Sequence, residues 1–254
     1  MSEVTTYSAG PRPAERHLAG LTARAEERVL LWMAPRVPGR VTSDHLTLLG
    51  FAAMAASGAL YAASDRHPWL LLVVNAGLAI NWLGDSLDGT LARYRRVERP
   101  RFGFYVDHLV DALGALCLLG GLAVSGLMSP PVAAGFLAAY YLLAIESCLA
   151  TYAIGRFKIS WGPVGGTELR ILLATVNVIV LFRPRVSAGG GAWLVFDAVG
   201  AGATAVLLVL AVVAGIRGTR TLAREEGWAP PLGADHVPGE RAGRTSLAEG
   251  RADS

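Results

Sequence analysis

Four aspartates, Asp85, Asp88, Asp107 and Asp111, lie where two long apolar segments of the chain meet. The first two are three residues apart and the last two are four apart, so each pair would share one face of a helix. Four ionised carboxylates repel one another and are costly to remove from water. Divalent cations relieve that repulsion, and carboxylate oxygens suit Mg²⁺ or Mn²⁺. Helix capping or solvated charge explains one such aspartate more readily than four, so the spacing predicts a metal site between two facing helices.

The elements that carry these aspartates belong to an apolar chain. Of its 254 residues, 53% are hydrophobic and 17% are charged, which is apolar for a soluble domain of this size. A transmembrane helix needs about 20 mostly apolar residues. Such windows span roughly 43–63, 69–88, 107–128, 130–153, 168–183 and 192–215. We therefore expect an all-α integral membrane protein with six transmembrane helices, and we expect no nucleic-acid partner.

Lysine and arginine are distributed unevenly along this pattern. With six spans, residues 1–42, 93–106, 154–170 and 217–254 share one side of the membrane, and they carry 20 of the 23 Lys and Arg residues. The positive-inside rule places that side in the cytoplasm. We therefore expect a multi-pass protein of the bacterial cytoplasmic membrane, with both termini and the aspartates on the cytoplasmic side.

The two ends of the chain differ from its apolar middle. Residues 1–13 and 218–254 are polar and contain Gly and Pro, so we expect a disordered N-terminus and a largely disordered cytoplasmic tail. Residues 14–36 have apolar side chains at three- or four-residue spacing. This spacing indicates an amphipathic helix lying on the membrane surface, although an ordinary solvated helix would show it too. The membrane domain is accordingly expected to cover residues 14–217.

The aspartates are part of a longer pattern. It reads Asp85-x2-Asp88-Gly89-x2-Ala92-Arg93, then nine residues, then Gly103-x3-Asp107-x3-Asp111. This run closely resembles the signature of the CDP-alcohol phosphotransferases, D-x2-D-G-x2-A-R followed by G-x3-D-x3-D. All the signature residues are present. The gap is slightly longer than is usual in the family, and a loop between two helices can accommodate the difference.

The resemblance implies a reaction in phospholipid synthesis. A phosphatidyl group would pass from CDP-diacylglycerol to the hydroxyl of a small polar alcohol, phosphorylated or not, with release of CMP. Asp85, Asp88 and Asp107 would bind two ions of Mg²⁺ or Mn²⁺, and Asp111 would bind metal and deprotonate the acceptor. The donor nucleotide site would be formed by Asp88, Gly89, Ala92, Arg93 and Gly103. Members of the family often form homodimers.

The acceptor site is predicted less directly. Arg156, Lys158 and Arg170 follow the fourth span, in a segment that resembles family members using glycerol phosphate or inositol phosphate. They would bind an acceptor phosphate, or else serve only to set the membrane topology. Glu146, inside the fourth span, is a second candidate because intramembrane acids are functional by default. It would suit a cationic acceptor such as choline, ethanolamine or serine, or else pair with an arginine.

Two other functions fit part of the sequence. The same signature occurs in enzymes that transfer phosphocholine or phosphoethanolamine from a CDP-alcohol to a lipid hydroxyl such as diacylglycerol, so the aspartates do not separate these two branches. An ion-coupled transporter would also carry acids in its spans. It predicts acids near the midplane and repeated halves, whereas the aspartates here cluster at one membrane edge and no repeat is visible.

Overall fold

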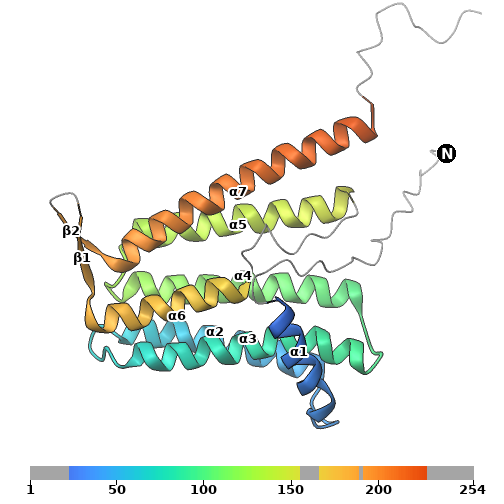
Figure 1. Cartoon of the computed structure of the whole chain (residues 1–254), viewed down its shortest axis with the longest axis horizontal. Helices are drawn as coiled ribbons and strands as arrows, with labels where there is room; N and C mark the ends of the chain where they lie inside the picture. The colour runs from blue at the N-terminus through green and yellow to red at the C-terminus, as the bar shows by residue number, and fades with distance from the viewer. Residues whose placement is uncertain (1–22, 155–165, 189–190, 228–254) are drawn as a thin grey trace, which may run out of the picture.

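The structure, a computed structural model, describes residues 23–154, 166–188 and 191–227 (Figure 1). Its helices are α1 (Ala23–Met33), the short 3-10 helix η1 (Ala34–Arg36), α2 (Ser43–Ala63), α3 (Leu70–Tyr94), α4 (Pro100–Val124), α5 (Pro130–Ile154), α6 (Gly166–Phe182) and α7 (Val195–Glu225). An antiparallel hairpin of β1 (Arg185–Ala188) and β2 (Gly191–Leu194) joins α6 to α7.

Five of these helices, α2, α3, α4, α5 and α7, are long and apolar enough to cross a membrane. The chain is therefore an integral membrane protein built almost wholly from helices. The fifth predicted span, 168–183, corresponds to α6, which has 17 residues. At 1.5 Å per residue this helix is about 26 Å long, less than the ~30 Å hydrocarbon core of a bilayer. The count of six spans therefore stays a prediction.

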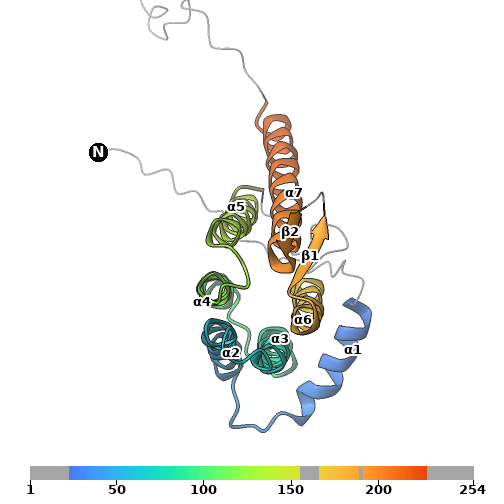
Figure 2. The same ribbon diagram turned by 90° about the vertical axis from the view of Figure 1, so that its left-hand side faces the viewer.

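The helices α2 to α7 form a closed ring when viewed along their axes (Figure 2). Around the ring, α2 packs on α3, α3 on α6, α6 on α7, α7 on α5, α5 on α4, and α4 on α2. The two helices that carry the aspartates, α3 and α4, are consecutive in the chain but lie on either side of α2. Their relative position is therefore set by how each of them packs on α2.

Glycines allow α2 to approach both neighbours closely. A Cβ added at Gly121 of α4 would lie 1.9 Å from the carbonyl oxygen of Gly58 in α2. A Cβ added at Gly84 of α3 would lie 2.5 Å from the carbonyl oxygen of Leu46, also in α2. Small residues at helix crossings permit such contacts in membrane proteins. Because Gly84 directly precedes Asp85, the crossing of α2 and α3 also sets the position of the first aspartate.

The largest buried apolar cluster lies at the end of the ring that bears the hairpin, which we call the hairpin end. Its members include Tyr61, Leu71, Leu122, Val180 and Phe196, drawn from α2, α3, α4, α6 and α7. At the opposite end, where α3 finishes and α4 begins, a smaller cluster packs α1 and η1 on α2 and α3. This cluster consists of Leu30, Ala34, Leu46, Leu87 and Leu91. We call that end the aspartate end.

A chain of buried polar side chains ties α6 to α2 and α3 at the hairpin end. The Tyr61 hydroxyl donates to Oδ1 of Asn177 at 2.7 Å, and both residues are fully buried. The Asn177 amide donates to Oδ1 of Asn75 at 2.7 Å, and the Asn75 amide donates to the carbonyl of Ala174 at 3.2 Å. Hydrogen bonds of this kind hold specific helix faces together in lipid, where water cannot satisfy the polar groups.

The all-α fold class is confirmed, and the structure adds one short hairpin in which Val186 pairs with Trp193. Hydropathy placed residues 192–194 of its second strand in a predicted span. Of the amphipathic helix predicted for 14–36, the described part from Ala23 onward forms α1 and η1; residues 14–22 lie outside the described residues. The last helix runs past the predicted domain end at 217 to Glu225. The tail predicted for 218–254 is helical as far as Glu225; its part beyond 227 and the N-terminus predicted to be disordered, 1–13, lie outside the described residues.

Neighbouring glycines of α4 provide a matched test of the close α2–α4 packing. Gly121→Ala would force its Cβ into the backbone of α2, so we expect an overpacking cost of about 1–3 kcal/mol. Gly120→Ala meets nothing within 4 Å and should leave the melting temperature unchanged or slightly raised, since Ala favours helix over Gly. Thermal unfolding of the detergent-solubilised variants measures both effects, and equal melting temperatures would contradict the proposed packing.

Candidate active site

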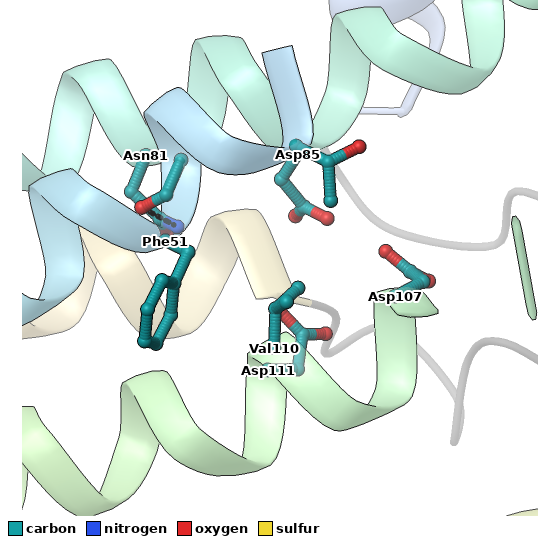
Figure 3. Close-up of a pocket in the computed structure, with 8 residues that line it drawn as sticks. Phe51, Asn81, Asp85, Asp107, Val110 and Asp111 are labelled. Atoms are coloured by element: carbon teal, nitrogen blue, oxygen red, sulfur yellow. Dashed lines mark hydrogen bonds between the residues drawn. The ribbon is translucent and has the colours of Figure 1, made fainter. Parts of the chain in front are cut away.

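Three of the four aspartates converge from α3 and α4 (Figure 3). Asp85, Asp107 and Asp111 each place one carboxylate oxygen within 4.8 Å of the other two; we call these three residues the aspartate cluster. They line a cavity of about 10 Å³ whose other walls are Thr47, Gly50, Phe51, Asn81 and Val110. Three hard oxygen donors at this separation form a ligand set that suits Mg²⁺ or Mn²⁺. The residues therefore fit the divalent metal that the signature implies.

Asp88 is close to this cluster but is not one of the three residues whose oxygens lie within 4.8 Å of one another. It is only 8% exposed, and its Oδ2 accepts a 2.6 Å hydrogen bond from the hydroxyl of Thr47 in α2. The Ser43 hydroxyl donates to the Asp88 carbonyl at 3.0 Å. Side chains three residues apart on an α-helix differ in direction by about 60°. Asp88 therefore points away from the direction of Asp85 and toward Thr47 of α2. These hydrogen bonds hold Asp88 against α2, whereas the other three aspartates face one another.

Arg170 reaches the aspartate cluster from the first turns of α6. Its Nη2 lies 2.7 Å from Oδ2 of Asp85, and its Nε donates to Oδ1 of Asn81 at 2.7 Å. The Asn81 amide in turn donates to the carbonyl of Gly50 in α2 at 3.0 Å. A guanidinium in this position offsets part of the negative charge and is well suited to hold a phosphate group.

Of the predicted acceptor residues, Arg170 therefore lies beside the aspartates. Arg156 and Lys158 lie outside the described residues. Glu146 is elsewhere: it belongs to α5 and faces α7, where a Cβ added at Gly218 would lie 3.8 Å from its Oε1. Its Oε2 is buried without a hydrogen-bond partner among the described residues. The structure thus does not bring Glu146 to the aspartate cluster, and its role in acceptor binding stays a prediction.

The remaining signature residues surround the facing ends of α3 and α4. Ala92 lines a second cavity of about 210 Å³, together with Thr42, Ser43, Leu91, Arg95 and Val97. Arg93 is exposed and donates to the Thr90 hydroxyl oxygen at 3.1 Å. Gly103 is exposed and has open space where a Cβ would stand, and Gly89 is half-buried beside Asp88. These residues leave room for a ligand next to the aspartate cluster.

Three residues in or near the site were not predicted from the sequence: Thr47 and Asn81, which line the cavity, and Glu26, which bonds to Ser86 and Thr167 beside it. Thr47 and Asn81 are polar side chains inside apolar windows, a signal that would have justified testing them as site residues. Glu26 carried no such signal, because it belongs to the polar face of an amphipathic helix and is followed by a second glutamate, Glu27. Only the folded arrangement shows that the Glu26 carboxylate points toward α3 and α6.

Two known proteins are similar in sequence to part of this chain. No family model matches the chain. The archaetidylinositol phosphate synthase of Pyrococcus horikoshii is 31% identical over 138 residues, which cover 54% of this chain and 70% of that protein. The CDP-archaeol synthase of Aeropyrum pernix is 32% identical over 115 residues, 45% of this chain and 64% of that protein, which is slightly less than two thirds of its length.

Five helices able to cross a membrane and three carboxylates able to hold a metal ion at one end of the ring suit a membrane-embedded, metal-using enzyme. With the complete aspartate signature, and with similarity over most of the Pyrococcus protein, the chain belongs to the CDP-alcohol phosphotransferase family. It is therefore a transferase of lipid biosynthesis, and the transporter alternative is set aside.

Metal binding at the aspartate cluster can be measured directly. Asp107→Asn removes one anionic ligand, so we expect the Kd for Mn²⁺ to rise by at least about 10-fold. The measurement is electron paramagnetic resonance of free Mn²⁺ during titration of the detergent-solubilised protein. Asp44→Asn is the matched control, because Asp44 is exposed at the same end and pairs with Arg99. Equal Mn²⁺ affinity in the two variants would exclude a metal site at the cluster.

Proposed function

We propose that this protein transfers a phosphatidyl group from CDP-diacylglycerol to the hydroxyl of a small polar alcohol and releases CMP. The observation that carries the proposal is the convergence of the aspartate cluster beside Arg170 at one end of a membrane-spanning ring. Mg²⁺ or Mn²⁺ bound there would offset the charge of the diphosphate and of the departing CMP. A site at the membrane edge suits a donor that joins a lipid tail to a soluble nucleotide.

The side chains divide the chemistry among them. Asp85 and Asp107 would hold metal together with Asp111, and Asp88 would contribute from its position against Thr47. Asp111 would accept the proton of the acceptor hydroxyl. The oxygen of that hydroxyl would bond to the phosphatidyl phosphorus as the bond from that phosphorus to CMP breaks. A carboxylate is a weak base for an alcohol, so most of the rate must come from positioning and charge stabilisation.

The donor nucleotide would bind beside this cluster. We assign Gly89, Ala92 and Gly103 to its binding surface, with Arg93 on a donor phosphate. Their support is the 210 Å³ cavity lined by Ala92 and the open space at Gly103, both of which adjoin the ends of the helices that carry the aspartates.

A phosphorylated polyol is the acceptor that we favour. Arg170 lies 2.7 Å from Asp85, so an acceptor phosphate held by its guanidinium would place the acceptor hydroxyl near the metal. Arg156 and Lys158, like Arg170, follow the fourth predicted span, and they would bind the same acceptor phosphate. The name of the Pyrococcus relative describes a product that contains inositol phosphate, which agrees with this class of acceptor.

The same proposal includes a membrane orientation. We infer six spans, with the short helix α6 as the fifth, and both termini and the aspartate end in the cytoplasm. The support is the concentration of Lys and Arg in the segments that six spans would put on the same side of the membrane as the aspartates. A cytoplasmic site suits a donor whose headgroup is a nucleotide.

An acceptor screen tests the proposed reaction. Purified protein would be incubated with CDP-diacylglycerol, Mg²⁺ and, in turn, glycerol phosphate, inositol phosphate, inositol, serine or no acceptor. A separate reaction would contain CDP-choline, diacylglycerol and Mg²⁺. We expect CMP release with one of the phosphorylated polyols. CMP release only from CDP-choline with diacylglycerol would show that the donor is a CDP-alcohol and the acceptor a lipid. No CMP release with either donor would refute the transferase reaction.

Substitution of Asp111 tests its assignment as the base. Asp111→Asn removes the proton acceptor but keeps the side-chain shape, so kcat should fall by about 100-fold or more while binding of the CDP-linked donor is largely retained. Asp197→Asn is the control, because Asp197 accepts from the Ser129 amide at the hairpin end. Initial rates and donor binding are measured for both, and substantial turnover by Asp111→Asn would show that another group takes the proton.

A further inference from the structure

One carboxylate of α1 connects that helix to both walls of the acceptor side of the site. Oε1 of Glu26 accepts hydrogen bonds from Nε1 of Trp82 at 3.2 Å and from the hydroxyl of Ser86 at 2.7 Å. Its Oε2 accepts a 2.9 Å hydrogen bond from the hydroxyl of Thr167. Trp82 and Ser86 belong to α3, whereas Thr167 belongs to α6. Glu26 therefore bridges two helices of the ring from outside it.

The bridge lies at the level of the aspartate cluster. Ser86 directly follows Asp85, and Thr167 lies about one helical turn before Arg170. The two ends of the Arg170–Asp85 ion pair are thus each within one turn of a residue that hydrogen-bonds to Glu26. Anything that moves the start of α6 away from α3 would also move the Arg170 guanidinium away from Asp85.

An ionised carboxylate suits this position for a chemical reason. The three partners all present N–H or O–H donors, and a carboxylate offers two oxygens with no donor of its own. Hydrogen bonds to a charged acceptor are roughly twice as strong as neutral ones. Anchoring α1 does not by itself require the bridge, since Leu30 and Ala34 are buried on α2 and α3 at 6% and 1% exposure.

We propose that Glu26 is a positioning residue of the transferase site. It holds the start of α6 against α3, so that Arg170 stays beside Asp85 and receives the acceptor phosphate. This inference rests on the proposed function, because it concerns the acceptor side of the same reaction. Through Glu26, α1 would affect the binding of the acceptor but not the binding of the donor.

The test compares Glu26→Ala with Glu27→Ala, which changes the adjacent exposed glutamate of the same helix. Rates of CMP release from CDP-diacylglycerol are measured against glycerol phosphate and inositol phosphate. We expect Glu26→Ala to raise the KM for the acceptor by about 10-fold, as the loss of a charge-assisted bridge implies. The KM for CDP-diacylglycerol should stay within about 2-fold of wild type, and Glu27→Ala should match wild type in both. A merely structural role would lower the active fraction without this selective change in KM.

Two further variants keep the test decisive if Glu26→Ala folds poorly. Glu26→Gln retains one acceptor oxygen and can donate to the Thr167 hydroxyl, so it should recover part of the acceptor affinity. Thr167→Val removes the contact with α6 alone, and combining it with Glu26→Ala should add little to the single change. Fully additive effects, or an unchanged acceptor KM in Glu26→Ala, would overturn the assignment while wild-type activity upholds the proposed function. A wild type that releases no CMP would refute both.

Discussion

Three carboxylates lie within 4.8 Å of one another in the aspartate cluster, at the end of a ring whose sides face lipid. Their repulsion grows as water is excluded, so the helices that carry them would separate unless something else held them. That role falls to α2. It packs on both α3 and α4 through glycine contacts too close for any Cβ, and this packing fixes the distance between the carboxylates before any cation arrives.

The position of α6 follows from the same constraint. Arg170 gives the cluster its cationic neighbour, and it can do so only if α6 stays beside α3. Polar contacts hold α6 at both ends: Tyr61 and Asn75 bond to it near the hairpin, and Glu26 bonds to Thr167 near the aspartates. Hydrogen bonds are directional, so they fix the rotation of α6 and hence the direction of Arg170 better than apolar contacts would.

Much of this arrangement could be predicted from the sequence, because hydropathy marks helices long enough to span a bilayer and the aspartate spacing marks a site. The rest depends on tertiary packing. Spacing showed that Asp85 and Asp88 lie near one helix face, but it could not show that Thr47 draws Asp88 toward α2. Similarly, no local pattern distinguishes Glu26 from Glu27. The hairpin escaped prediction because its second strand continues into an apolar window that hydropathy assigns to a helix.

The division of the ring into two unlike ends explains why these polar contacts gather where they do. At the hairpin end, apolar side chains from α2, α3, α4, α5, α6 and α7 form one buried cluster. This cluster stabilises the ring and contains none of the residues assigned to the reaction. The aspartate end must admit a charged donor and an acceptor, so it cannot be filled in the same way. The side chains at the aspartate end are therefore positioned by hydrogen bonds at the periphery of the site, from Thr47, Asn81 and Glu26. These contacts leave the space between the reacting groups for substrates.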